Sequence, residues 1–176
     1  MMERPLFKTS AELLVERATL LGYGGLMPFV FTALVLWTSP YLVPFGLAGQ
    51  VMQWELYYAA IILSFMGGVR WGLAMMEPTI HTISEFTIAR LTGSIAPALI
   101  GWLALVPDWF IPFGDPGYAL RHGIILFAFI YLMISDLQAV REGAAPAWYG
   151  PLRRKLTFFL GLLLALIILR LIMWGW

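Results

Sequence analysis

The stretch that decides the fold is LSFMGGVRWGLAMM, Leu63–Met76, an apolar run that carries three glycines and one arginine. The apolar character continues upstream to Met52, which makes the segment long enough to cross a bilayer, where a helix needs about 20 apolar residues. The rest of the chain is similar, because 61% of its 176 residues are hydrophobic and 12% are charged, against about 45–50% and about 25% in soluble domains. The sequence therefore predicts an integral membrane protein.

Five stretches of the chain are long and apolar enough to span a membrane as helices. The links between them are short and rich in turn residues, which leaves no room for a soluble domain. The capping-box spacing of Thr9–Glu12 predicts a short amphipathic helix before the first span. We expect an all-α fold, with a bundle of about five transmembrane helices over residues 20–176 and an interfacial cytoplasmic segment over residues 1–19. The expected spans are Leu20–Trp37, Met52–Met75, Phe86–Val106, Tyr118–Val140 and Leu156–Trp174.

The distribution of Lys and Arg predicts the orientation in the membrane, because these residues concentrate on the cytoplasmic side. The N-terminus and the second and fourth links carry nearly all of them, and only Arg121 falls on the other side. We therefore expect a bacterial inner membrane protein with a cytoplasmic N-terminus and a periplasmic C-terminus. The residues expected on the cytoplasmic side are Arg4, Lys8, Arg17, Arg90, Arg141, Arg153, Arg154 and Lys155.

Small residues on the second span predict a helix-packing face. Ser64, Gly68 and Gly72 recur every fourth residue and so share one side of the helix, with Gly67 beside them. In lipid, such faces let another helix approach closely. The favoured interpretation is packing against a neighbour in the same bundle. Contact with another protein, or with the tail of a bound cofactor, stays open.

Arg70 points nearly opposite the glycine face. An arginine exposed to lipid near mid-membrane costs about 2.5–3.5 kcal/mol on insertion scales, so Arg70 needs a partner. Asp136 lies as far into the fourth span as Arg70 lies into the second, which predicts an intramembrane ion pair between them. Arg90 could compete for the same carboxylate. A structural clamp is the favoured role, and proton or substrate handling is the alternative.

Four polar residues are expected together near the outer interface: Glu55, Arg121, His122 and Arg170. Long arginine side chains at that depth can extend to water, which is the favoured interpretation. The alternative is a polar vestibule that binds an anionic or quinone-like head group.

Several kinds of chemistry are not indicated by the sequence. The chain has no cysteine, and its two histidines, His81 and His122, are expected on opposite sides of the membrane, so they cannot share a haem or metal. A net charge of +1 gives no basis for nucleic-acid binding. No hydrolase or phosphate-binding motif appears. We therefore expect a protein that is not an enzyme and needs no metal or cofactor, although a lipid or quinone could be bound.

Four blocks carry a resemblance to a known family: LGYGGLMPFV (21–30), YYAAIILSFMGGVRWGLAM (57–75), SIAPALIGWLALV (94–106) and AWYGPLRRKLT (147–157). In this order they resemble an uncharacterised bacterial membrane family, a domain of unknown function, related to mitochondrial transmembrane protein 69. The resemblance implies a small polytopic protein of bacterial or mitochondrial inner membranes, with no reaction assigned. It supports the glycines and Arg70 as positions to test.

The expected function is that of an accessory subunit or assembly factor in a membrane protein complex, with an energy-transducing membrane as the favoured setting. This expectation rests on the small size, the glycine face and the absence of active-site motifs. The expected partners are membrane lipids and other integral membrane proteins or further copies of the chain. The alternative is a small carrier or channel, or a protein that binds a quinone or lipid head group through its intramembrane charges.

Overall fold

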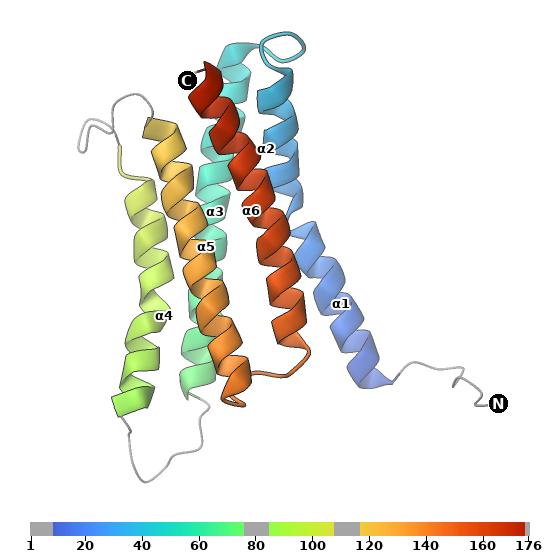
Figure 1. Ribbon diagram of the computed structural model, residues 1–176, viewed down its shortest axis with the longest axis vertical. Coiled ribbons are helices and arrows are strands. Elements are labelled where there is room, and N and C mark those ends of the chain that lie inside the picture. The colour runs from blue at the N-terminus through green and yellow to red at the C-terminus, as the bar shows by residue number, and fades with distance from the viewer. Residues whose placement is uncertain (1–8, 76–84, 108–116, 175–176) are drawn as a thin grey trace, which may run out of the picture.

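The computed structural model describes residues 9–75, 85–107 and 117–174, with the side chains of α4 described from Ile88 onward. These residues form an all-helical bundle, which confirms the predicted fold class (Figure 1). The helices are α1 (Ser10–Gly24), α2 (Met27–Thr38), α3 (Phe45–Met75), α4 (Glu85–Ala104), α5 (Gly117–Arg141) and α6 (Tyr149–Trp174).

Four helical segments are long and apolar enough to cross a membrane, so the chain is an integral membrane protein. They are α3, α5, α6 and the combined segment Ser10–Thr38, which joins α1 and α2. The third predicted span is helical as well, but its apolar part, Ile88–Ala104, is shorter than the others. α1 begins and α6 finishes at opposite ends of the bundle (Figure 1). We call these the N-terminal end and the C-terminal end.

The predicted capping box starts α1. The Thr9 hydroxyl oxygen accepts from the Glu12 backbone N–H at 3.3 Å, and the Glu12 carboxylate accepts from the Thr9 N–H at 2.8 Å. These contacts satisfy two donors that a helix N-terminus otherwise leaves free. The capping box is therefore confirmed, but α1 is part of the first span, Ser10–Thr38, and not a separate helix before it.

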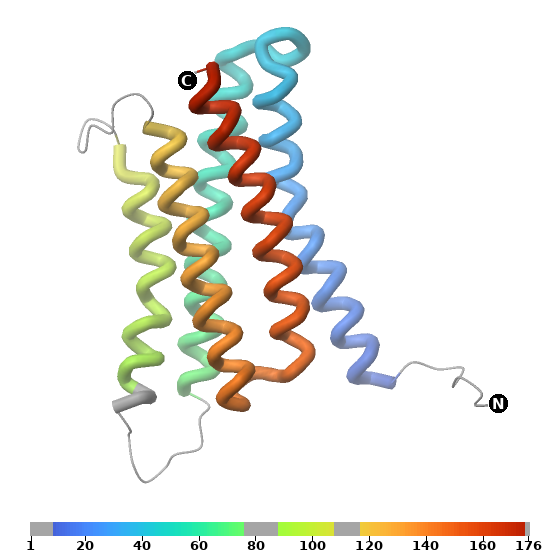
Figure 2. The backbone as a smooth tube through the Cα atoms, viewed as in Figure 1, coloured from blue at the N-terminus to red at the C-terminus, as the bar shows by residue number. Residues whose placement is uncertain are grey.

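The first span changes direction between α1 and α2, as the tube in Figure 2 shows. Pro28 sits in the first turn of α2, where its missing N–H breaks no helical hydrogen bond. The Tyr58 hydroxyl of α3 donates to the Gly25 carbonyl oxygen at 3.0 Å and ties this junction to the bundle. Beyond the junction α2 runs along α3 and α6, whereas α1 leans away from the bundle and packs on α6.

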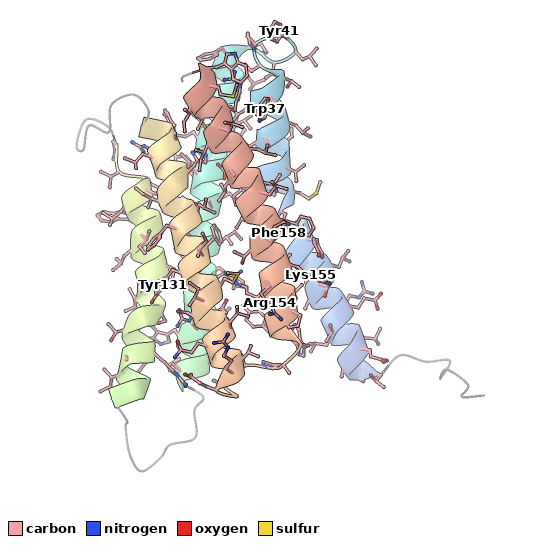
Figure 3. All side chains as sticks on the ribbon, in the orientation of Figure 1. Trp37, Tyr41, Tyr131, Arg154, Lys155 and Phe158 are labelled. Atoms are coloured by element: carbon pink, nitrogen blue, oxygen red, sulfur yellow. The ribbon has the colours of Figure 1, made fainter. Side chains whose placement is uncertain are left out.

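The core lies where α3 packs on α4 and α5 packs on α6, with α3 and α5 in contact between the two pairs. Side chains from α2, α3, α5 and α6 fill its centre, and a second apolar cluster joins α2 to the C-terminal end of α6. Trp37 and Tyr41 lie toward the C-terminal end, and Arg154 and Lys155 toward the N-terminal end (Figure 3). The largest fully buried side chains are Phe29, Phe129, Leu36, Met52, Leu56 and Leu63.

Two helices begin earlier than predicted. α3 starts at Phe45 rather than Met52, and α6 starts at Tyr149 rather than Leu156. The sequence around Pro151 reads as a link, but proline is well tolerated in the first turn of a helix. Arg153 therefore belongs to α6 and not to a loop, which brings it into the site described next.

Candidate functional site

Asp136, near the end of α5, is the centre of a buried polar cluster. Its side chain is 3% exposed. Its Oδ2 lies 2.8 Å from Arg153 Nε and accepts a hydrogen bond from the Tyr149 hydroxyl at 3.1 Å, both from α6. Its Oδ1 lies 3.9 Å from Arg70 Nε on α3. We call these four residues the Asp136 cluster. The predicted Arg70–Asp136 pair is present, but Arg153 is the closer partner.

Local geometry explains why α5 and α6 meet at this carboxylate. Gly143 adopts φ 75°, a conformation that favours glycine, and its N–H donates to Val140 as the chain reverses after α5. The last turns of α5 then lie beside the first turns of α6. Tyr149 and Arg153 are four residues apart on α6, so both side chains face the same carboxylate.

The charges in the Asp136 cluster do not balance. The guanidinium groups of Arg70 and Arg153 share one carboxylate. Among the described residues, Asp136 is the only acidic residue within 4.0 Å of either group. Arg70 Nη1 and Arg153 Nη2 are buried, and within this part of the chain they have no hydrogen-bond partner. Buried charge is stable only when it is paired and hydrogen-bonded. The cluster therefore holds one excess positive charge with donors to spare.

Arg90, the expected competitor for Asp136, pairs with Glu142 instead. Glu142 follows the last residue of α5 and also accepts a hydrogen bond from Gln138 Nε2 at 2.8 Å. The Gln138 hydrogen bond, and then the contact with Arg90, lower the pKa of Glu142 below its usual value. This exposed pair links α4 to the end of α5 and leaves Asp136 to the other two arginines.

Glu55 and His122, two members of the predicted outer cluster, form a buried pair. His122 Nε2 lies 2.8 Å from Glu55 Oε2, with both side chains at most 1% exposed. His122 Nδ1 lies 2.7 Å from the Tyr118 carbonyl oxygen, which can only accept, so Nδ1 carries a proton. One further proton is shared between Nε2 and Oε2. The pair is neutral whichever atom holds that proton.

Arg121 and Arg170 do not extend to water as expected. Both are buried, at 3% and 4% exposed. Arg121 Nη1 donates to the Ala104 carbonyl oxygen at 3.3 Å, and Arg170 donates to Leu36 and Ser39 at 3.0 and 3.2 Å. These carbonyls end α4 and α2, where the helix dipole favours a cation. The expectation of snorkelling is wrong because helix ends inside the bundle offer better acceptors.

Among the small residues of α3, Gly67 contacts a neighbouring helix, whereas Gly68 and Gly72 contact none within the described part of the chain. A Cβ at Gly67 would lie 2.5 Å from the Ser94 carbonyl oxygen, so Gly67 permits the close approach of α3 and α4. Gly68 and Gly72 have nothing within 4 Å where their Cβ atoms would be, and Ser64 is exposed. Packing within the bundle is therefore confirmed for Gly67 and wrong for Gly68 and Gly72.

Two further points concern metals and missed residues. His81 lies outside the described residues, and the described residues contain no group of three or more metal-ligating side chains. Sequence reasoning missed Tyr149 and Arg153 because it ended the fourth link too late. The tolerance of a first helical turn for Pro151 was the available signal, since extending α6 backward places Arg153 beside the end of α5.

The chain belongs to the family described as "Protein of unknown function (DUF3429)", whose model matches residues 14–169. Transmembrane protein 69 of Xenopus tropicalis is 39% identical over 89 residues, which are 51% of this chain and 32% of that protein. The match thus covers about a third of that curated relative. No solved structure gives a significant match. These findings confirm the resemblance carried by the four sequence blocks.

Proposed function

We propose that this member of the DUF3429 family is a non-catalytic protein that binds another integral membrane protein, as an accessory subunit or assembly factor. The proposed contact is the outward face of α3 that carries Ser64, Gly68 and Gly72, which we call the α3 small-residue face. The proposed location is the bacterial inner membrane, with the N-terminus in the cytoplasm and the C-terminus in the periplasm. An energy-transducing complex of that membrane is the favoured partner.

The observation that carries this proposal is that Gly68 and Gly72 are open, with nothing within 4 Å of a Cβ placed at either residue. A glycine inside a helix costs about 0.5–1 kcal/mol relative to alanine. Gly67 already provides the close contact with α4, so these two glycines contribute nothing to packing among the described residues. In lipid, faces of small residues gain energy when a second helix packs on them. A partner helix would recover the cost.

The test compares the wild-type protein with two glycine-to-leucine variants in native purification from the membrane, followed by quantitative mass spectrometry of the retained proteins. The wild-type protein should retain a membrane protein in stoichiometric amount. Gly68→Leu should lose that partner while the chain stays folded, because the substitution meets open space. Gly123→Leu is the matched control, since residue 123 on α5 is also open and should leave binding intact.

Two outcomes would contradict partner binding through this face. One is a wild-type protein that emerges without any stoichiometric protein partner. The other is a Gly68→Leu variant that keeps its partner as well as Gly123→Leu does. A self-associated wild-type protein that becomes monomeric in Gly68→Leu supports the same face with a second copy of the chain as the partner.

The Asp136 cluster supports a second candidate function, that of a small carrier or channel or of a protein that binds a quinone or lipid head group. Intramembrane charges are costly, and they are typical of sites that handle polar groups. The cluster joins α3, α5 and α6 and has one arginine more than its carboxylate needs. Neutralising Arg153 and Asp136 together should preserve the fold and abolish such binding. Arg70→Gln with Asp136→Asn leaves Arg153 without its carboxylate and is the harsher variant.

A further inference from the structure

A lateral groove of about 400 Å³ lies between α1, α3 and α6. Its volume falls within the range of about 300–1,000 Å³ that is typical of sites for small molecules. α1 leans away from α6 toward the N-terminal end (Figure 1). Residues of α1 and α6 both line the groove. Leu21 and Phe65 form part of its wall and are 76% and 63% exposed, so the groove opens sideways, where lipid lies.

The walls of the groove are apolar along most of their length. α3 contributes Ile62, Phe65 and Met66, and the opposite walls come from α1, α2 and α6. An open apolar groove in a bilayer is filled by hydrocarbon, because water finds no hydrogen-bond partners there. The groove itself therefore favours an acyl or isoprenoid chain over a soluble ligand.

One end of the groove is polar and connects to the Asp136 cluster. Tyr149, Arg153 and Thr157 line it, and Arg153 forms the ion pair with Asp136. Arg153 and Thr157 are 6% and 5% exposed. Arg153 Nη2 and Thr157 Oγ1 are buried atoms that lack a hydrogen-bond partner within the described part of the chain. This end of the groove is therefore lined by two side chains with unpaired polar atoms, Arg153 and Thr157. Arg153 also belongs to the Asp136 cluster, which has one excess positive charge.

The polar and apolar parts of the groove follow the bundle axis. Tyr149 and Arg153 lie in the first turns of α6 at the N-terminal end, and Leu160 lines the groove further along the same helix. Residues 149 to 160 rise by roughly 16 Å at about 1.5 Å per residue. This length is about half of a hydrocarbon core roughly 30 Å thick. A lipid of the nearer leaflet matches this arrangement, because its polar head group lies at the membrane surface and its chains extend through about half of the hydrocarbon core.

We propose that the α1–α3–α6 groove binds one anionic phospholipid from the leaflet at the N-terminal end. Its phosphate lies against Arg153 and Thr157, and an acyl chain runs along Phe65, Met66 and Leu160. The inference rests on the second candidate function and gives it a ligand class. It does not require the α3 small-residue face to bind a partner.

Charge decides between a phospholipid and a quinone. The Asp136 cluster has two guanidinium groups and one carboxylate, so it lacks one negative charge. A phosphodiester supplies that charge, and its oxygens accept the forked hydrogen bonds of a guanidinium. A quinone head group is neutral and leaves the excess charge uncompensated. A phosphodiester therefore fits the polar end of the groove, and a quinone does not.

The test reconstitutes the purified, delipidated protein into nanodiscs of mixed phosphatidylcholine and phosphatidylglycerol. The protein is then extracted in mild detergent, and its bound lipids are counted by native mass spectrometry. The wild-type protein should retain one phosphatidylglycerol per chain, well above that lipid's share of the nanodisc. Arg153→Gln should reduce this retention by roughly tenfold, because a charged hydrogen bond to the phosphate is lost.

Matched variants separate the site from general charge and folding effects. Arg154→Gln removes the same charge from the next residue of α6, which is exposed and lies outside the groove lining, and should retain the lipid (Figure 3). Ala18→Trp fills the groove from α1 without altering the Asp136 cluster, and should lose the lipid. If Arg153→Gln fails to fold, Ala18→Trp decides the question.

Three results would overturn the proposal: equal phosphatidylglycerol retention in Ala18→Trp and wild type, a loss in Arg154→Gln equal to that in Arg153→Gln, or phosphatidylcholine retained in place of phosphatidylglycerol. Because the assay contains no other integral membrane protein, its outcome is independent of partner binding at the α3 small-residue face. A wild-type protein that retains no phosphatidylglycerol but keeps its protein partner would reject the lipid site and leave the proposed partner function standing.

Discussion

The two ends of the bundle both bury charged side chains, yet they use them differently. Toward the C-terminal end, Glu55 and His122 form a neutral pair, and Arg170 bonds to the carbonyls at the end of α2 while lying 4.9 Å from the centre of the Trp174 ring. At the N-terminal end, Arg70 and Arg153 converge on Asp136 beside an open groove. Both ends keep some buried polar atoms without a partner among the described residues.

The two ends therefore differ in what lies next to the buried charges: helix ends at one end and an open groove at the other. They do not differ in whether every buried polar atom has a hydrogen-bond partner. Charges that bond to helix ends hold neighbouring helices in place. Charges that meet at one carboxylate next to a cavity are positioned for a ligand as well. The predictions below test this division, beginning with the largest expected effect.

Removal of Asp136 should be the most damaging single change at the N-terminal end. Asp136→Ala leaves Arg70 and Arg153 buried without a counter-charge, which should reduce the free energy of unfolding by about 3–5 kcal/mol. Thermal and denaturant unfolding in detergent measures this loss. Asp136→Asn combined with Arg153→Gln should recover part of it. If the double variant unfolds as readily as Asp136→Ala, the ion pair is not what holds α5 and α6 together.

The glycine pair on α3 distinguishes packing within the chain from packing against a partner. Gly67→Leu forces a side chain against the backbone of α4 at Ser94, and overpacking of this kind costs about 1–3 kcal/mol. Gly68→Leu meets open space and should change the free energy of unfolding by less than about 0.5 kcal/mol. Unfolding midpoints of the two purified variants provide the comparison. Equal destabilisation would mean that α3 is rotated relative to α4.

The sequence predicts part of the site, namely the depth of its charged residues, but not which helix faces meet. Depth along two parallel spans was enough to place Arg70 level with Asp136, because an α-helix advances by a fixed rise per residue. Periodicity could not decide between the faces of Gly67 and Gly68, since rotation depends on the shape of the neighbouring helix. Arg170 bonds to Leu36, which is 134 residues away, and no local pattern signals such a contact.

The Glu55–His122 pair at the C-terminal end should behave as a structural element. Glu55→Ala leaves the buried imidazole without its partner and should cost about 1–3 kcal/mol of unfolding free energy. Glu55→Gln can donate an amide N–H to His122 Nε2 and should cost clearly less. Unfolding midpoints of both variants test this order. A Glu55→Gln variant that folds normally but loses phosphatidylglycerol retention would instead couple this pair to the groove, and the division between the two ends would fail.

The smallest effect is expected at the exposed Glu142, which links the end of α5 to Arg90. The pKa of this carboxyl is lowered from its ordinary value of 4.5, first by the Gln138 hydrogen bond and then by Arg90. A group with a lowered pKa contributes its stability above the ordinary pKa and loses it as the pH falls through the lowered value. Wild type and Glu142→Gln should therefore differ slightly in unfolding midpoint near neutral pH and converge on acidification. Because the contact is exposed, salt should reduce the difference as well, whereas the buried Asp136 cluster should respond far less to salt. A salt response at Asp136 as large as that at Glu142 would mean that water and ions reach the cluster freely, and that its excess charge needs no lipid.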